Sequence, residues 1–253
     1  MTEIVDIHGV KINNLTMEEA LDFTMSMLEN NSPGRIYTPN SEIIMQAYRD
    51  EELKSILNDA DILVADGAGV VLASRILNKN LKEKVSGIDL VKRIFKNTKK
   101  RPISFFILGG KPGVPEKAAI NIYSEYPKAK IVGYHHGYFK EEQIPEIIEN
   151  INKSKAEVLL VGLGAPKQEK WIHEHYKQLS CKVIMGVGGT IDVFAGTATL
   201  APEFIRKAGL EWLYRLIKQP SRYKRMLDLP RFMILTLKTK LNQKSNINDK
   251  NSN

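Results

Sequence analysis

The chain has a single cysteine and no long apolar run, and its first residues do not resemble an export leader. These three features argue against a disulfide-bonded, a membrane-spanning and an exported protein. Because Cys181 stands alone among 253 residues, an internal disulfide is excluded and a cysteine-based metal site is not expected. The most apolar C-terminal stretch, residues 232–237, is far shorter than the ~20 residues that span a bilayer. Residues 1–10 have neither a basic nor an apolar leader region, so we expect a cytosolic protein that meets a membrane only from its inner face.

Two common nucleotide-binding signatures are also missing. The segment Gly162-Leu-Gly-Ala-Pro-Lys167 begins like a dinucleotide fingerprint, but Lys167 stands at the third glycine position and Pro166 precedes it. No Gly-x-x-x-x-Gly-Lys-Ser/Thr phosphate loop occurs. The altered fingerprint argues against a nicotinamide oxidoreductase, and the missing loop argues against a phosphate-loop enzyme. We expect no cofactor.

Positive charge is concentrated near the C-terminus. Residues 201–244 hold eleven of the 37 Lys and Arg residues but three of the 29 acids, so the rest of the chain carries 26 of each sign. The same stretch is rich in large apolar residues. A membrane surface carrying a phosphorylated lipid satisfies both properties, whereas nucleic acid satisfies only the charge and would need aromatic residues spaced for stacking. The charge alone is equally compatible with a solvated basic helix whose apolar face packs on the body.

Strand-like and helical segments alternate through most of the chain. After two short strands around residues 8–9 and a capping box at Thr16 and Glu19, apolar strands are expected at 35–38, 62–65, 103–108, 130–133, 158–161 and 183–187. Helical periodicity lies between them, at 42–48, 69–77, 88–96, 115–126, 142–151 and 167–178. This alternation predicts an α/β fold with a Rossmann-like, mainly parallel sheet and helices on both faces.

The pattern changes after residue 200. We expect residues 1–200 to form one α/β domain. Residues 201–241 form a basic, amphipathic helical appendage in this scheme, and Pro220 and Pro230 break it into short pieces. The polar, Asn-rich residues 242–253 are expected to be disordered.

Glycines and small polar residues follow strand after strand, where parallel sheets bind ligands. Glycine allows the backbone to approach a phosphate closely, although it also serves ordinary strand-to-helix turns. The candidate nucleotide-binding residues are Gly109, Gly137, Gly164, Gly188, Gly189 and Asp192. Asp192 has a helix cap as its alternative role.

Asp66 is the acid that the pattern favours for catalysis. It follows the apolar strand at 62–65, so its carboxylate is expected at the ligand edge, where it can accept a proton from a hydroxyl nucleophile. Its alternative role is to cap the helix that begins near Ala68. Asp59 and Asp61 have the spacing of a metal-binding acid pair but precede the strand, so we reject them as a metal site.

Three arginines of the appendage have helical spacing. Arg222 and Arg225 are one turn apart, and Arg215 lies one heptad before Arg222. They would share a face if a helix continued through Pro220. Such a face could clamp a diphosphate and neutralise a leaving group without a metal.

Several motifs together resemble the WecG/TagA/CpsF glycosyltransferases, glycosyltransferase family 26, over nearly the whole chain to about residue 235. They are Tyr37-Thr-Pro-Asn40, Ala65-Asp-Gly67, Val85-Ser-Gly-Ile-Asp-Leu90, Gly162-Leu-Gly-Ala-Pro-Lys-Gln-Glu169, Gly186-Val-Gly-Gly-Thr-Ile-Asp-Val-Phe-Ala-Gly196 and Arg206-Lys-Ala-Gly-Leu-Glu-Trp-Leu-Tyr-Arg215. The resemblance implies an inverting, metal-independent transfer from a UDP-sugar to an undecaprenyl-diphosphate-linked acceptor at the inner membrane face. In the teichoic-acid branch, N-acetylmannosamine passes from UDP-N-acetylmannosamine to the 4-hydroxyl of lipid-linked N-acetylglucosamine.

The resemblance also assigns roles to residues. It implies that Asp66 is the general base, and it places Thr38, Asn40 and Gln168 in the substrate pocket. Arg215, Arg222 and Arg225 are implied to contact diphosphate. Lys84 stands where members of the family commonly have Arg, which keeps the charge but loses the bidentate fork.

The sequence leaves other functions open. The donor could be another UDP-sugar, of the glucose or N-acetylmannosamine uronate type, and the chain could be a noncatalytic nucleotide-sugar-binding module. The apolar appendage could also dock on a second copy when no membrane is present, so a dimer or trimer in solution is plausible.

Overall fold

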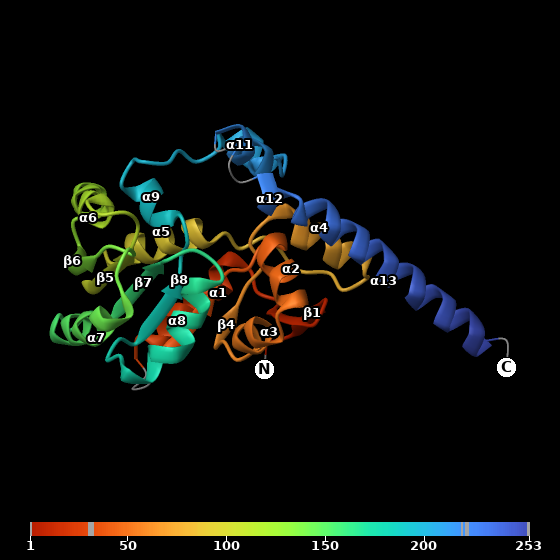
Figure 1. Cartoon of the computed structure of the whole chain (residues 1–253), viewed down its shortest axis with the longest axis horizontal. Coiled ribbons are helices and arrows are strands. Elements are labelled where there is room, and N and C mark those ends of the chain that lie inside the picture. Colours follow the sequence, from red (N-terminus) through yellow and green to blue (C-terminus); the bar gives the residue numbers. More distant parts are fainter. Residues whose placement is uncertain (1, 30–32, 219, 221–222, 252–253) are drawn as a thin grey trace.

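The central element is a six-stranded parallel sheet in the order β4-β3-β8-β7-β5-β6 (Figure 1). A computed structural model describes residues 2–29, 33–218, 220 and 223–251 of the chain. The strands are β3 Gly34–Tyr37, β4 Ile62–Leu63, β5 Ile103–Gly109, β6 Ala129–His135, β7 Val158–Gly162 and β8 Val183–Gly186. Every neighbouring pair in this sheet is parallel, which confirms the predicted Rossmann-like α/β fold.

Helices cover both faces of the sheet, because alternate strand residues feed two separate cores. One core includes residues of α2 Ser41–Arg49, α3 Glu51–Asn58, α4 Ala68–Ile76, α7 Ile144–Lys153 and α8 Lys167–His175. The other includes residues of α1 Met17–Met27, α5 Gly87–Asn97, α6 Val114–Glu125 and α9 Thr190–Phe194. The predicted helices all occur, and 3₁₀ turns at Glu141–Gln143 and Tyr176–Gln178 flank α7 and α8.

Sequence periodicity did not predict α3 or α9. Asp50 explains why α3 forms, because it ends α2 and its side-chain oxygen accepts the Leu53 N–H at 3.0 Å, which caps the next helix. The N-terminal strands β1 Ile4–Ile7 and β2 Val10–Asn13 form the expected hairpin. The capping box at Thr16 is also confirmed.

The described part of the C-terminal segment contains the α-helices α10 Glu203–Lys207, α11 Glu211–Lys218, α12 Tyr223–Met226 and α13 Asp228–Asn251. The expected break at Pro230 is wrong, because Pro230 lies in the first turn of α13, where its missing N–H costs little. The helix also continues to Asn251, through residues expected to be disordered. No Gly or Pro follows Pro230 to end it. None of the described helices is long and apolar enough to span a membrane.

The first half of α13 is anchored in the body. Phe232 is fully buried in the core, with its ring edge-on to His8 at a centroid distance of 5.4 Å. His8 Nε2 lies 2.9 Å from Thr236 Oγ1, and Arg49 of α2 donates to both carboxylate oxygens of Asp228 at 3.0 and 2.7 Å. Beyond this anchor, α13 extends past the rest of the molecule (Figure 1).

The buried ring of Phe232 gives a test of this docking. Phe232→Ala should lower the free energy of unfolding by about 3–5 kcal/mol, because it leaves a cavity in the core. Leu237→Ala, on the exposed side of the same helix, should change it by less than about 0.5 kcal/mol. Urea unfolding of both variants measures the difference, and equal small effects would show that α13 is not part of the core.

Candidate functional site

Asp66 lies at the carboxyl edge of the sheet and touches the start of α5. Its carboxylate Oδ2 accepts the Gly87 N–H at 3.2 Å, and its own N–H donates to Pro39 O at 3.0 Å. The N-cap position of α4 is Gly67, which has no side chain to accept from the first turn. The half-buried Asp66 is therefore held between the turn after β3 and the first residue of α5.

Thr38 converges on the same glycine. A Cβ added to Gly87 would meet Thr38 Oγ1 at 2.6 Å, so the two residues are in close contact and no larger residue fits at position 87. Asn40, two residues on, uses its side-chain oxygen to cap α2 by accepting the Ile43 N–H at 3.0 Å. Thr38 and Asn40 therefore line the edge that carries Asp66, and the cap fixes the orientation of the Asn40 amide.

Gln168 connects α8 to the glycine turn after β8. Its Oε1 accepts the Gly188 N–H at 2.9 Å, and its Nε2 donates to Glu169 Oε1 at 2.8 Å. Gln168 is buried, and both ends of its amide are engaged within the protein. The structure thus gives Gln168 a role in shaping the edge of the sheet.

Glu169 was missed by the sequence analysis. It is 1% exposed, burial raises the pKa of its carboxyl, and its Oε2 has no hydrogen-bond partner among the described residues. The available signal was its place beside Gln168, in the first turn of a helix that begins at the sheet edge. Glu169 orients the Gln168 amide and so acts on the Gly188 turn through its neighbour.

The candidate glycines fall into two groups. A Cβ on Gly109 would lie 2.4 Å from Gly162 O, and one on Gly137 would lie 2.9 Å from the Leu163 side chain, so both are required by packing. In contrast, nothing lies within 4 Å of the Cβ position at Gly164 or Gly189, and at Gly188 only Gln168 Oε1 does, at 3.9 Å. Only the second group leaves backbone open to a ligand.

Asp192 lies near this open group. It is half-buried in the first turn of α9, whose N-cap is Gly189, so Asp192 is not a helix cap. The open glycines follow β7 and β8, whereas Asp66 and Thr38 follow β4 and β3. These four strands are neighbours in the sheet, so the candidates meet along one edge.

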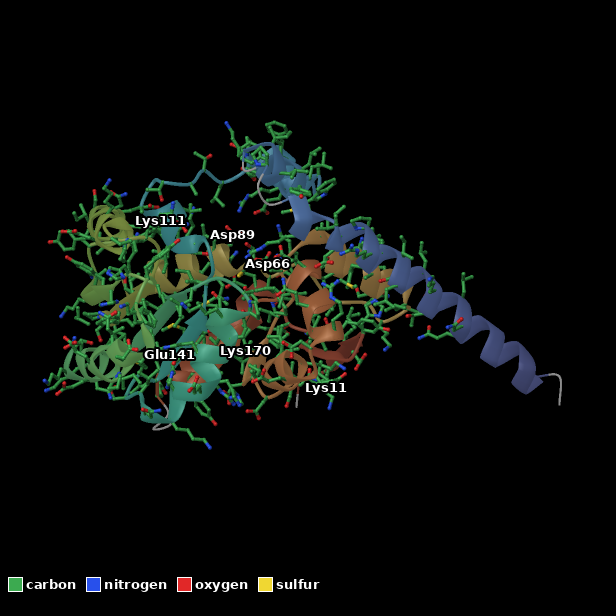
Figure 2. All side chains as sticks on the ribbon, in the orientation of Figure 1. Lys11, Asp66, Asp89, Lys111, Glu141 and Lys170 are labelled. Carbon is green, nitrogen blue, oxygen red and sulfur yellow. The ribbon has the colours of Figure 1, made fainter. Side chains whose placement is uncertain are left out.

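The C-terminal helices cover this edge beside Asp66. Arg206 Nη1 of α10 lies 3.1 Å from Asp89 Oδ2 of α5. Arg225 Nε of α12 lies 3.8 Å from Glu42 Oε1 of α2. Figure 2 shows Asp66 and Asp89 on the side of the body toward α11 and α12. The side chain of Arg215 and all of Arg222 lie outside the described residues, so the three-arginine face remains a prediction.

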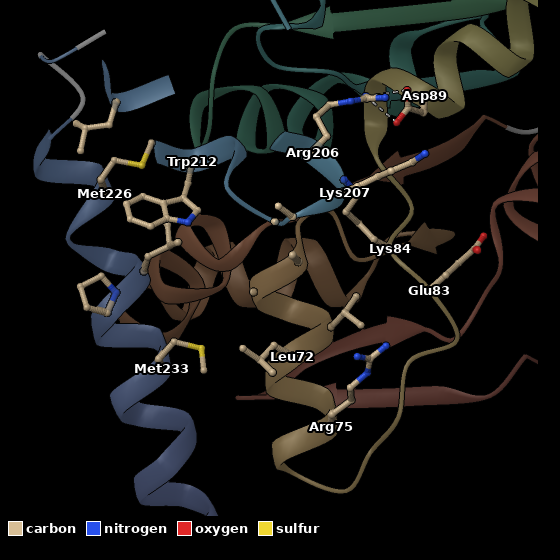
Figure 3. Close-up of a pocket in the computed structure, with 18 of the residues that line it drawn as sticks. Leu72, Arg75, Glu83, Lys84, Asp89, Arg206, Lys207, Trp212, Met226 and Met233 are labelled. Carbon is tan, nitrogen blue, oxygen red and sulfur yellow. Dashed lines mark hydrogen bonds and ion pairs between the residues drawn. The ribbon is translucent and has the colours of Figure 1, made fainter. Parts of the chain in front are cut away.

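A cavity of about 1180 Å³ separates α4 and α5 from these helices (Figure 3). Lys84 lines it, and the next residue, Val85, donates its N–H to Ala65 O at 2.9 Å. Ala68 and Gly69, directly after the Asp66-Gly67 turn, also line it. The cavity therefore reaches the neighbourhood of Asp66.

Asp59 and Asp61 lie at the opposite edge of the sheet and bind Arg35. Arg35 Nη1 donates to Asp59 Oδ2 at 2.8 Å, and its Nε lies 3.5 Å from Asp61 Oδ2. The hydrogen bond from Arg35 lowers the pKa of Asp59. This acid pair therefore holds the start of β3. The described residues contain no group of three His, Cys, Asp or Glu side chains that could hold a metal.

Comparison with known proteins identifies the family. The model of the WecG/TagA/CpsF family of glycosyl transferases matches residues 5–246. The chain belongs to this family. It is 32% identical over 240 residues to the N-acetylglucosaminyldiphosphoundecaprenol N-acetyl-beta-D-mannosaminyltransferase of Bacillus subtilis (strain 168), covering 94% of this chain and 93% of that protein. It is 35% identical over 241 residues to the protein of the same name from Staphylococcus aureus (strain MRSA252), covering 94% of each.

Within this glycosyltransferase, the buried Glu169 should make stability depend on pH. Its raised pKa means that stability is fully present below the ordinary carboxyl value of 4.5 and is lost as pH rises above it. Glu169→Gln stays neutral and keeps an oxygen for the Gln168 amide, so its free energy of unfolding should fall less from about pH 5 to pH 8.

Urea unfolding at several pH values measures this difference. Glu146→Gln, at an exposed position on α7, is the control and should follow the wild-type curve. Identical pH slopes for wild type and Glu169→Gln would contradict the prediction.

Proposed function

We propose that this chain transfers N-acetylmannosamine from UDP-N-acetylmannosamine to the 4-hydroxyl of N-acetylglucosamine in N-acetylglucosaminyl-diphospho-undecaprenol. The product is a lipid-linked ManNAc-β1,4-GlcNAc disaccharide for wall teichoic acid synthesis. The names of relatives that match over nearly their full length support the donor sugar and the acceptor. The observation that carries the mechanism is the Asp66 carboxylate, held at the ligand edge beside Thr38 and the cavity.

The proposed reaction is a single in-line displacement with inversion. The acceptor oxygen forms a bond to C1 of the donor sugar while the bond from C1 to the β-phosphate oxygen breaks. The proton of the hydroxyl passes to Asp66, and the bonding electrons leave with UDP. One base is sufficient for this step, and the Gly87 N–H holds one carboxylate oxygen of Asp66 in place.

The open glycines support a binding site for the UDP group at the carboxyl ends of β7 and β8. A phosphate can approach the backbone closely at Gly164, Gly188 and Gly189. Asp192, in the first turn of the helix that follows Gly189, is the proposed partner of the ribose or the base. We assign the developing charge on UDP to Arg215, Arg222 and Arg225 instead of a metal. Arg225 is about half exposed and only loosely paired with Glu42, which leaves its guanidinium able to turn toward phosphate.

We also propose that the enzyme acts on the inner face of the cytoplasmic membrane. The face of α13 opposite Phe232 is apolar and exposed, with Ile234, Leu237 and Leu241 each more than half exposed and Lys238 on the same side. A solvated basic helix accounts for the packed face of α13 but not for this second apolar stripe. Apolar side chains beside basic ones favour insertion at an anionic lipid surface.

Replacing the proposed base tests the reaction. Asp66→Asn should reduce the turnover number by about 10²–10⁴-fold, because it removes the proton acceptor but keeps an oxygen for the Gly87 N–H. UDP-sugar binding should stay largely unchanged. UDP release with lipid-linked N-acetylglucosamine and calorimetric UDP-sugar binding are the measurements.

Asp22→Asn, on the exposed side of α1, is the control and should be fully active. Wild-type turnover by Asp66→Asn would remove Asp66 from the mechanism. The same assay with several UDP-sugars tests the donor, and UDP binding without release would favour a noncatalytic module.

The exposed stripe gives a separate test of membrane docking. The double variant Leu237→Gln/Leu241→Gln should bind anionic liposomes at least about tenfold more weakly, because each change removes apolar area from the contact. Cosedimentation measures the binding, with Phe23→Gln on α1 as an exposed control. Unchanged binding by the double variant would exclude this face as the membrane contact. These substitutions are sharper than deleting the appendage, which would also remove Phe232 from the core.

A further inference from the structure

The cavity beside Asp66 has an apolar wall on each side. Leu72 of α4, which is 49% exposed, stands on one side. Trp212 of α11, Met226 of α12 and Met233 of α13 stand on the other, and Figure 3 shows these side chains lining the space between the helices. Such walls favour an apolar ligand, because each side chain gains by removing surface from water.

Basic side chains outnumber acidic ones in the lining of the same cavity, five to three. Arg206 is paired with Asp89, and Lys207 with Glu203. Lys84 and Arg75 also line the cavity, and neither has an ion-pair partner among the described residues. The cavity therefore combines apolar walls with positive charge, as a lipid carrying phosphate requires.

The cavity is separate from the open glycines proposed to hold the nucleotide. Gly164, Gly188 and Gly189 do not line it, and its walls come from α4, α5, the loop between them and α10 to α13. Its volume of about 1180 Å³ is also larger than the ~300–1,000 Å³ usual for small-molecule sites. An extended lipid chain fits these dimensions and this lining.

We propose that the space between α4 and α13, here called the α4–α13 groove, holds the proximal isoprene units of the acceptor's polyprenyl chain. This inference rests on the proposed function, which supplies the polyprenyl diphosphate acceptor. Helix α13 then contributes to both sites. Met233 on one side of α13 contacts the lipid in the groove, and Leu237 and Leu241 on its outer face contact the bilayer.

The order of groups along α4 matches the order of groups in such an acceptor. The acceptor sugar would lie at Asp66, two residues before α4 begins. The diphosphate would lie beside Lys84, whose neighbour Val85 donates its N–H to Ala65 O. Leu72 lies four residues into α4, or about 6 Å along its axis. The lipid then continues between Leu72 and Met233 toward the outer stripe of α13.

Direct binding tests the groove without turnover. Farnesyl diphosphate is a soluble probe, and Trp212 in the groove reports on it, because the second tryptophan, Trp171, is buried in the core. The probe should change the Trp212 emission and bind at least about tenfold more tightly than inorganic diphosphate. Leu72→Gln should weaken farnesyl diphosphate about tenfold and leave inorganic diphosphate unchanged, whereas Leu72→Met should restore binding.

Ile234→Gln is the matched control, because Ile234 is exposed on α13 but does not line the groove, and it should bind the probe normally. Equal affinity for the two diphosphates, or normal farnesyl diphosphate binding by Leu72→Gln, would overturn the groove.

A parallel UDP-release assay separates the two proposals. Groove-dependent binding without UDP release overturns the proposed function alone, and UDP release that is indifferent to Leu72→Gln with a polyprenyl acceptor overturns the groove alone.

Discussion

The docking of α13 through Phe232 is the interaction on which the proposed acceptor site depends. A fully buried aromatic ring, with the Arg49–Asp228 pair at the start of the helix, fixes α13 across α2 and α4. Because Met233 follows Phe232 directly, fixing the buried ring also places the groove wall. Core packing, which is stiff, thus sets the α13 side of the cavity, and the Arg206–Asp89 and Arg225–Glu42 pairs hold α10 and α12 on the body.

A second constraint acts at the start of α5. Asp66 and Thr38 come from different strands, yet both contact Gly87, which has no side chain to separate them. The carboxylate is therefore positioned by two neighbouring strands and one helix terminus at once. Such a base can be oriented before substrate arrives, so less free energy is needed to order it during the reaction.

The sequence predicted the layers of the fold because buried strands and amphipathic helices each have a clear period. It also placed Asp66 and Thr38 at one edge, since carboxyl ends of parallel strands must meet there, whereas Lys84 was singled out only by the family resemblance. It could not predict that Gly109 and Gly137 serve packing while Gly164 and Gly189 stay open, because that depends on contacts between distant strands. Glu169 was missed for a similar reason, since its burial follows from the way α8 sits on the sheet.

The structure also changes the meaning of the basic C-terminal segment. Arg206, Lys207, Arg225 and Arg231 face acids within the chain, so a good part of the positive charge seen in the sequence already has a partner inside the protein. In the proposed membrane contact, attraction to anionic lipid then rests on fewer cations, such as Lys238, and on the apolar stripe beside them. Arg206 instead ties α10 to the start of α5, two residues from the Gly87 that holds Asp66. Charge in this segment therefore helps to hold the C-terminal helices against the body. Under our two proposals, apolar side chains on the outer face of α13 contact the bilayer, and those beside the groove contact the acceptor lipid.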